Sequence, residues 1–240
     1  MTKFDRDLCP TCGSNYAKFS CKREDWKNGD CNCNQQNKLW VEYSIANIPR
    51  EYFSKDFSDY EFKDISKDKK FYKDIKKFVE YIDNVSEMGA CLYLHNEVPS
   101  TGKSFFAISI LKEAHRKNYS INFVPFVKIY NEVLNNRFDI FNKLDKTEFL
   151  VIDGVSRKTN TTFLADVKLL THFEQFLRER HKPIIFTGSA TLSNPDYDLL
   201  GVIKKVMQNR IYELNIDSDL QYENLNYWDN IKTAKKEQIK

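Results

Sequence analysis

The stretch Cys91–Ser104, CLYLHNEVPSTGKS, decides the fold that we expect. It begins with Cys91–His95, a mainly apolar run with the length and composition of a buried strand. A polar loop follows, then Gly102-Lys103-Ser104, then a helical run. Strand, loop, Gly-Lys-Ser and helix are the layout of a phosphate-binding loop, in which backbone N–H groups and the N-terminus of the helix surround an anion.

This loop predicts a nucleotide site in which Lys103 reaches the β- and γ-phosphates of ATP and the Ser104 hydroxyl ligates Mg²⁺. Two residues depart from the full pattern, G-x-x-x-x-G-K-[ST]. Glu97 occupies the position of its first glycine, and Ser100 fills another position that is often glycine. The alternative is a strand-to-helix turn that carries Gly-Lys-Ser by chance. The residues expected around the phosphates are Pro99, Ser100, Thr101, Gly102, Lys103 and Ser104.

Length and composition indicate a globular protein with one substantial core and a small additional module. The chain has 240 residues, of which 41% are hydrophobic and 30% charged. No apolar run approaches the roughly 20 residues that a membrane helix needs, so we expect no membrane association. The first residues show no secretory signal, which favours a cytosolic (cytoplasmic) protein with reduced thiols. The net charge is only +3, so binding to nucleic acid would need a local basic patch.

Five of the six cysteines lie in the first 33 residues. Cys9 and Cys12 have the spacing of a zinc knuckle, and Cys31 and Cys33 supply a second pair. Four thiolates suit Zn²⁺ and leave no open position for chemistry, so the predicted zinc is structural. Cys21 is a fifth candidate, which either replaces one of these four ligands or has a structural role. A redox function, or none, is the alternative to zinc.

A second motif supports the phosphate loop. Four apolar residues, Phe149–Ile152, lead into Asp153, as in a Walker B strand. A buried parallel strand that ends here places its carboxylate beside the phosphate loop, where it holds Mg²⁺ through water. Many buried strands end in aspartate, so the motif alone is weak. Its position about 50 residues after the phosphate loop makes the two motifs predict nucleotide binding together.

Strands and helices alternate along the rest of the chain, which predicts an α/β fold with a parallel sheet. Strands expected near residues 91, 121, 149, 184 and 212 give the five-stranded core of a P-loop NTPase of the AAA+ or RecA-like kind. A lysine-rich helix over 67–85 is expected to present a solvated face, with contact to DNA phosphates as the alternative. Residues 34–38 are interpreted as a polar loop, and the charged tail over 217–240 is expected to be helical in part, with fraying as the alternative.

Several segments together resemble the AAA+ helicase loaders of bacteria and their phages, the DnaC/DnaI type, with the IstB transposition ATPases as close relatives. The similarity covers about residues 9–216, and the cysteine-rich N-terminus suggests the Gram-positive or phage branch. The segments that carry it are Tyr43–Tyr52 (an A-x-I-P-x-x-Y segment), Leu92–Ser104 (Walker A), Phe149–Asp153 (Walker B), Arg180–Ser189 (the sensor 1 strand) and Val206–Ile211 (the arginine-finger segment).

The resemblance implies a role for each part of the chain. Residues 1–40 would be a zinc-binding module that docks on a hexameric replicative helicase, and residues 41–66 a linker. Residues 67–217 would be the AAA+ core, which binds ATP and single-stranded DNA and associates with neighbouring copies. Residues 218–240 would form a C-terminal tail.

The resemblance also assigns catalytic roles, residue by residue. Asp153 would hold Mg²⁺, Ser189 stands where sensor 1 has asparagine, and Arg210 is the candidate for an arginine finger that reaches a neighbour's nucleotide. Gly154 replaces the acidic residue that usually follows the Walker B aspartate and activates the attacking water. Because binding and water activation use different groups, we expect ATP and Mg²⁺ to bind while hydrolysis is slow or absent.

Two other functions stay open at this point. The first is an IstB-like ATPase that serves transposition or recombination, against which the cysteine-rich N-terminus argues. The second is a zinc adaptor with a decayed phosphate loop, for example an inhibitor that captures a host helicase. Single-stranded DNA binding that depends on ATP would separate a loader from such an adaptor.

Overall fold

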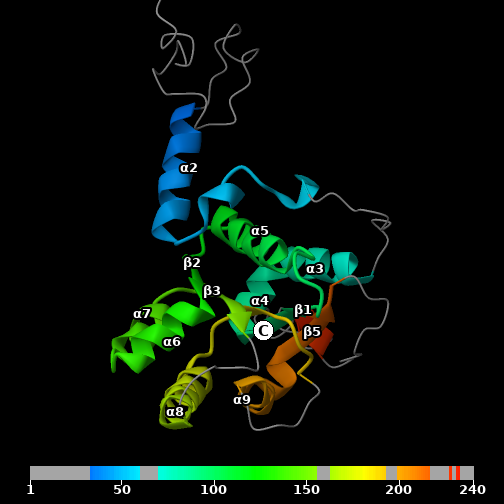
Figure 1. Ribbon diagram of the computed structural model, residues 1–240. Coiled ribbons are helices and arrows are strands. Elements are labelled where there is room, and N and C mark those ends of the chain that lie inside the picture. The colour runs from blue at the N-terminus through cyan, green and yellow to red at the C-terminus, as the bar shows by residue number, and fades with distance from the viewer. Residues whose placement is uncertain are drawn as a thin grey trace, which may run out of the picture. The chain divides into compact units, whose positions relative to one another are not determined.

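The structure of the chain, a computed structural model, describes residues 33–59, 70–155, 163–192, 199–216, 227–228 and 231–232, with the backbone alone for 33–37 and 163–166 (Figure 1). The chain divides into two compact units, residues 1–58 and 59–240. Four of the predicted zinc ligands, Cys9, Cys12, Cys21 and Cys31, lie outside the described residues. Cys33 is described only by its backbone, so the zinc site stays a prediction.

The described part of the first unit contains helix α2 (Cys33–Ile45) and the short helices η3 (Arg50–Tyr52) and η4 (Phe57–Asp59), the last of which reaches the second unit. The prediction of a loop over 34–38 is wrong, because these residues belong to α2. The stretch contains neither glycine nor proline, and its glutamines and lysine are good helix formers. The predicted boundary between residues 40 and 41 therefore lies inside a helix.

A five-stranded parallel sheet forms the centre of the second unit, as the sequence predicted. Its strands are β1 (Cys91–His95), β2 (Ile121–Pro125), β3 (Phe149–Val155), β4 (Ile184–Gly188) and β5 (Ile211–Asn215). Their order in the sheet is β2-β3-β4-β1-β5. Strand β4 thus lies between β3 and β1, so three carboxyl ends meet at one edge of the sheet.

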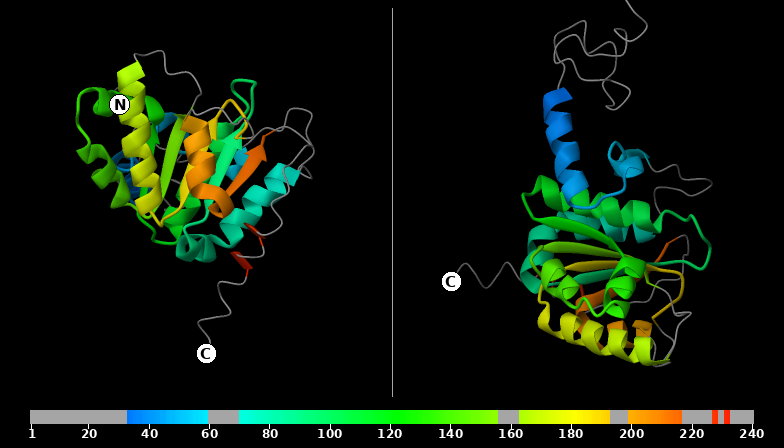
Figure 2. Two further views of the ribbon diagram at one scale, coloured as in Figure 1. Left: turned by 90° about the horizontal axis from the view of Figure 1, so that it is seen from below. Right: turned by 60° about the vertical axis from the view of Figure 1, so that its left-hand side comes forward.

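Helices cover both faces of this sheet (Figure 2). Helices α3 (Lys70–Glu80) and α5 (Lys103–Arg116) pack together on one face, and α6 (Phe126–Leu134), α8 (Phe163–Glu179) and α9 (Leu199–Met207) lie on the other. Helices α4 (Ile82–Met88) and α7 (Asp139–Asp145) and the short η5 (Gln208–Arg210) complete the described helices. No helix within the described ranges is long and apolar enough to cross a membrane.

The single helix predicted over 67–85 is two helices in the structure. Helix α3 ends at Glu80 and α4 begins at Ile82, because Tyr81 leaves the helical conformation with φ −96° and ψ 27°. Residues 67–69 lie outside the described part. Of the lysines expected on one face, Lys70, Lys73, Lys76 and Lys77 lie on α3, and Lys69 lies outside the described residues.

Part of the C-terminal tail is anchored to the sheet. Tyr227, Trp228 and Ile231 are buried, the first and last almost completely. The Tyr227 hydroxyl donates a hydrogen bond to the carbonyl oxygen of Cys91 (2.9 Å), and the Asn84 side-chain amide donates one to the carbonyl oxygen of Ile231 (2.6 Å). The three tail residues are helical, so the prediction of a partly helical tail is confirmed for them and the alternative of fraying is not.

Candidate nucleotide-binding site

The predicted phosphate loop connects the carboxyl end of β1 to the N-terminus of α5. All five residues of β1 are buried, and α5 begins at Lys103 directly after the loop. Gly102 has φ 87° and Ser100 has φ 61°, so both residues adopt the left-handed conformation. Glycine accepts this conformation at no steric cost, whereas a serine pays about 1 kcal/mol for it. The geometry thus explains why position 100 often carries glycine in such loops.

Asn96 fixes the base of the loop to two neighbouring strands. Its backbone N–H donates to the Gly188 carbonyl oxygen at the end of β4 (3.4 Å), and its side-chain amide donates to the Asn215 amide oxygen at the end of β5 (3.2 Å). Its own side-chain oxygen accepts a hydrogen bond from the Val98 backbone (2.7 Å). The first turn of the loop is therefore held by the sheet before any ligand arrives.

The Lys103 side chain bends back over its own loop. Its ammonium group donates hydrogen bonds to the carbonyl oxygens of Asn96 (3.1 Å) and Val98 (3.0 Å) and to the Thr101 hydroxyl (3.2 Å). Partial burial lowers the pKa of Lys103, and the charge of Asp153 opposes that shift. A phosphate bound in the loop would take the place of the carbonyl oxygens as the partner of this cation.

The Walker A and Walker B residues meet in the structure. The Ser104 hydroxyl donates a hydrogen bond to Oδ1 of Asp153 (2.7 Å), and the Thr187 hydroxyl donates one to the same oxygen (2.6 Å). These residues come from α5, β3 and β4 respectively. Hydroxyl and carboxylate oxygens are the ligands that Mg²⁺ prefers, so this donor set fits the expected ion.

Strand β3 contains one extra residue next to Asp153. Ile152 pairs with Phe186 and Val155 pairs with Gly188, so three steps along β3 match two along β4. Gly154 lies inside this bulge with φ 79°, and its N–H donates to the Thr187 hydroxyl (2.9 Å). Position 154, which carries an acidic residue in the family pattern, is therefore a glycine with a left-handed backbone conformation inside a β-bulge.

Ser189, the residue at the sensor 1 position, is exposed directly after β4. The Tyr93 hydroxyl donates to the carbonyl oxygen of the next residue, Ala190 (2.5 Å). A side chain at Gly188 would overlap this hydroxyl and would place its Cβ 2.7 Å from the Val155 carbonyl oxygen. Sequence analysis missed the roles of Tyr93 and Gly188, which follow only from the pairing of β1 with β4.

A buried histidine and glutamate lie beneath the same segment. One oxygen of Glu213, on β5, accepts hydrogen bonds from the Thr191 hydroxyl and the Leu192 backbone, both 2.8 Å long. His95 Nε2 lies 3.1 Å from that oxygen without the alignment of a hydrogen bond. Burial lowers the pKa of His95 to about 4 and raises the pKa of Glu213. His95 is therefore neutral at pH 7. The only hint of this pair in the sequence is that His95 is the last residue of the otherwise apolar strand β1.

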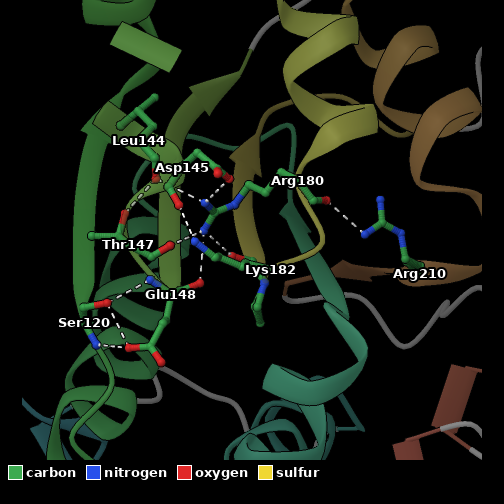
Figure 3. A network of polar contacts seen from close by, with 9 residues as sticks. Ser120, Leu144, Asp145, Thr147, Glu148, Arg180, Lys182 and Arg210 are labelled. Atoms are coloured by element: carbon green, nitrogen blue, oxygen red, sulfur yellow. Dashed lines mark hydrogen bonds and ion pairs between the residues drawn. The ribbon is translucent and has the colours of Figure 1, made fainter. Parts of the chain in front are cut away.

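Arg210 lies at the opposite end of the sheet from the phosphate loop. It precedes the amino end of β5, and its guanidinium donates a hydrogen bond to the carbonyl oxygen of Arg180 (3.2 Å; Figure 3). The Arg180 side chain is itself buried and donates to the carbonyl oxygens of Leu144, Thr147 and Glu148. The structure does not bring Arg210 to Ser104 or Asp153 of its own chain, so any contact with nucleotide requires a second copy.

Among the residues whose side chains the structure describes, no group of three or more His, Cys, Asp or Glu could hold a metal ion. The candidate magnesium site above instead combines one carboxylate with hydroxyl groups, and a bound nucleotide would supply further oxygens. It therefore differs in kind from the all-cysteine zinc site that is predicted for the N-terminal unit.

Neither a scan against models of protein families nor a search of curated proteins found a match. Solved structures do share the fold. A protein from Streptococcus pyogenes serotype M3, provisionally described as a primosome component, has a TM-score of 0.55 at 18% identity over 73% of this chain and 92% of its own. A DnaI structure has a TM-score of 0.53 at 19% identity, covering 70% of this chain and 94% of its own. A DnaC helicase loader has a TM-score of 0.52 at 15% identity, covering 70% and 100%. The chain thus shares the fold of these proteins.

Proposed function

We propose that this chain is a cytosolic helicase loader of DNA replication, which binds ATP and Mg²⁺ through its AAA+ core. In this proposal it also binds single-stranded DNA and delivers a hexameric replicative helicase to it. The observation that supports this most is the contact of Ser104 with Asp153 beside an intact Gly-Lys-Ser turn. The fold adds support, because it is shared with structures described as DnaI and as the DnaC helicase loader.

The proposed roles follow the geometry of the loop. Residues 99–104 surround the phosphates, and Lys103 leaves its loop carbonyls to contact the β- and γ-phosphates. Ser104 and Asp153 would hold Mg²⁺, the first directly and the second through water, and Ser189 would take the sensor 1 role at the end of β4. Bound Mg²⁺ would neutralise phosphate charge, and the chain itself supplies orientation.

Slow hydrolysis is part of the proposal, because the bulge at Gly154 leaves no carboxylate after Asp153. Without that acid the attacking water has lost its usual general base, while the groups that bind phosphate remain. Arg210 would act on the nucleotide of a neighbouring copy, which implies self-association through the ATPase core. ATP binding then controls assembly, and rapid ATP hydrolysis is not required for it.

The N-terminal unit is proposed to carry the docking function. Cys9, Cys12, Cys31 and Cys33 would hold one structural zinc ion, with Cys21 as the alternate ligand. Their spacing supports this, since a module of that size needs a metal or an equivalent cross-link to fold. The partner would be the helicase.

A thermal-shift titration with ATP and Mg²⁺ tests the nucleotide part. At ATP concentrations of about 100 times Kd, binding should stabilise the wild type by about 2.7 kcal/mol. Lys103→Ala should lose most of that shift, because the phosphates lose their cation. Lys117→Ala, an exposed lysine just after α5, is the matched control and should behave as the wild type does. Equal shifts in Lys103→Ala and wild type would count against specific ATP binding.

Mixing the protein with candidate replicative helicases, with and without ATP, tests the loader part. Complex mass is measured by light scattering, and binding of single-stranded DNA to the complex is followed in parallel. A loader should give a defined complex and DNA binding that depends on ATP and Lys103. A complex without ATP-dependent DNA binding would indicate an inhibitory adaptor, and the absence of any complex would contradict the proposal.

A further inference from the structure

Thr187 lies at the centre of the polar contacts in the candidate site. Its side chain is almost fully buried, with 2% of the residue exposed. Its hydroxyl contacts Oδ1 of Asp153 at 2.6 Å and the backbone nitrogen of Gly154 at 2.9 Å. A hydroxyl has a single proton, and a backbone N–H can only donate. The Gly154 contact therefore uses an oxygen lone pair, and the proton of Thr187 must point at Asp153.

We infer that Thr187 is a positioning residue of the magnesium site, which orients the Asp153 carboxylate by a hydrogen bond whose direction is fixed by the bulge at Gly154. This inference rests on the proposed nucleotide function. In the present arrangement Oδ1 of Asp153 accepts two hydroxyl groups, those of Ser104 and Thr187. The two are not equivalent once an ion binds.

Binding of Mg²⁺ changes what Ser104 does. To ligate the ion its hydroxyl offers a lone pair to the metal, and its single proton can stay on Asp153 because a hydroxyl has two lone pairs. Thr187 is not expected to ligate the ion, and it keeps its proton on Oδ1. Without Thr187 the carboxylate of the loaded site would lose one of its two hydroxyl partners, so this loss should affect Mg²⁺ binding more than ATP binding.

Gly154 contributes to the site through its backbone N–H, which the bulge directs at the Thr187 hydroxyl. Its peptide N–H occupies the lone-pair side of the Thr187 hydroxyl, which a regular extended strand would not guarantee at this register. The extra residue in β3 thus contributes a backbone donor where the family pattern has an acidic side chain. In this proposal the site still orients the Asp153 carboxylate, although it lacks the acidic residue that would activate water.

The experiment compares Thr187→Val and Thr187→Ser with the wild type. Valine keeps the branched shape but removes both hydrogen bonds, and serine keeps both. Thermal shift at saturating ATP is recorded against MgCl₂ concentration, and ATP binding in EDTA is measured separately. Losing one hydrogen bond to a charged group should raise the Mg²⁺ concentration for half-maximal shift about tenfold in Thr187→Val. Thr187→Ser should stay within about twofold of wild type, and binding in EDTA should be unchanged in both.

The outcomes separate this inference from the function on which it rests. If wild type shows no ATP·Mg²⁺ shift, or Lys103→Ala keeps it, the proposed function fails first. If both behave as expected but Thr187→Val has an unchanged Mg²⁺ requirement, or weakens binding equally in EDTA, Thr187 is only structural and the inference is overturned. Should Thr187→Val not fold, Thr187→Cys replaces it, with an expected rise of about threefold because a thiol is a weak donor. An unchanged requirement in that variant would overturn the inference too.

Discussion

Two glycines at the edge of the candidate site are needed for different physical reasons. Gly188 has no room for a side chain, because a Cβ would overlap the Tyr93 hydroxyl and approach the Val155 carbonyl oxygen. Gly154 has open space around it, with no atom within 4 Å of a built Cβ, but it holds a left-handed φ of 79°. One is restricted by packing and the other by backbone conformation.

The same substitution should therefore have two different effects. Gly154→Ala is expected to lower the free energy of unfolding by about 1 kcal/mol, the cost of a left-handed alanine. Gly188→Ala is expected to lower it by about 3 kcal/mol through overpacking. Tyr93→Phe removes the overlapping hydroxyl, so it should recover part of the loss in Gly188→Ala and none in Gly154→Ala. Urea unfolding of the three single variants and of the two double variants that contain Tyr93→Phe measures this in two double-mutant cycles. Additive effects for Tyr93 and Gly188 would show that the two do not clash.

At the residue scale the sequence was informative where a motif names the residue directly. Lys103, Ser104 and Asp153 could be predicted because their spacing is fixed by the loop and the strand that carry them, and the structure brings the last two into contact. Thr187 and Glu213 could not, since their roles depend on which strand lies beside which. A single sequence contains no signal for the pairing of β4 with β3 or of β5 with β1.

At the scale of elements, β1 and β5 share a buried pair whose ionisation should be visible in stability. The pKa of His95 is lowered to about 4 from a usual value of 6.5, mainly by burial and then by the charge of Lys103. Between about pH 4 and pH 6.5, His95 binds a proton in the unfolded chain but stays neutral in the folded chain. The contribution of His95 to stability is therefore lost as the pH falls from about 6.5 toward 4.

We expect this loss to amount to about 2 kcal/mol between pH 7 and pH 5. Glu213 acts in the opposite direction, because burial raises its pKa and so favours the folded state at lower pH. The measured quantity is therefore the difference between wild type and His95→Gln in urea unfolding at each pH. The wild type should lose its advantage over the variant as the pH falls. A difference that does not change with pH would show that His95 is not held neutral.

Elements were predicted well wherever burial on both sides makes the sequence continuously apolar. All five strands were expected at the residues where they lie. For the central strands β3, β4 and β1 the reason is burial on both faces, whereas β2 and β5 are edge strands whose sequences also contain polar residues. Helix limits were less accurate. The break at Tyr81 is marked by no glycine or proline, so local propensity could not reveal it. The extension of α2 back to Cys33 could have been predicted, because residues 34–38 contain good helix formers and no helix breaker.

At the scale of the whole molecule, a C-terminal segment that contains Tyr227, Trp228 and Ile231 packs into the core of the second unit. Tyr227 stacks on Tyr212 with ring centroids 5.2 Å apart, and the Lys77 ammonium lies 4.2 Å from the centre of the Trp228 ring. Ile231 is fully buried. The tail is charged overall, and the sequence predicted only partial helix for it, without packing against the sheet.

Ile231→Ala should therefore behave as a core substitution although it lies ten residues from the C-terminus. Truncation of a fully buried isoleucine costs about 2 to 5 kcal/mol, which corresponds to a fall in Tm of roughly 5 to 15 °C for a domain of this size. Lys232→Ala, the exposed neighbour, is the control and should change stability by less than about 0.5 kcal/mol. Identical thermal unfolding of the two variants would mean that the tail is not anchored.

The kink at Gly154 also affects how this protein can evolve. A single substitution to aspartate or glutamate would add a carboxylate, but the left-handed backbone would direct it away from where an extended strand directs it. Removing the extra residue of β3 alone would shift every later side chain to the opposite face of the sheet. Each step is unfavourable without the other. An acidic side chain after Asp153 in the orientation of an extended strand would therefore require both changes together.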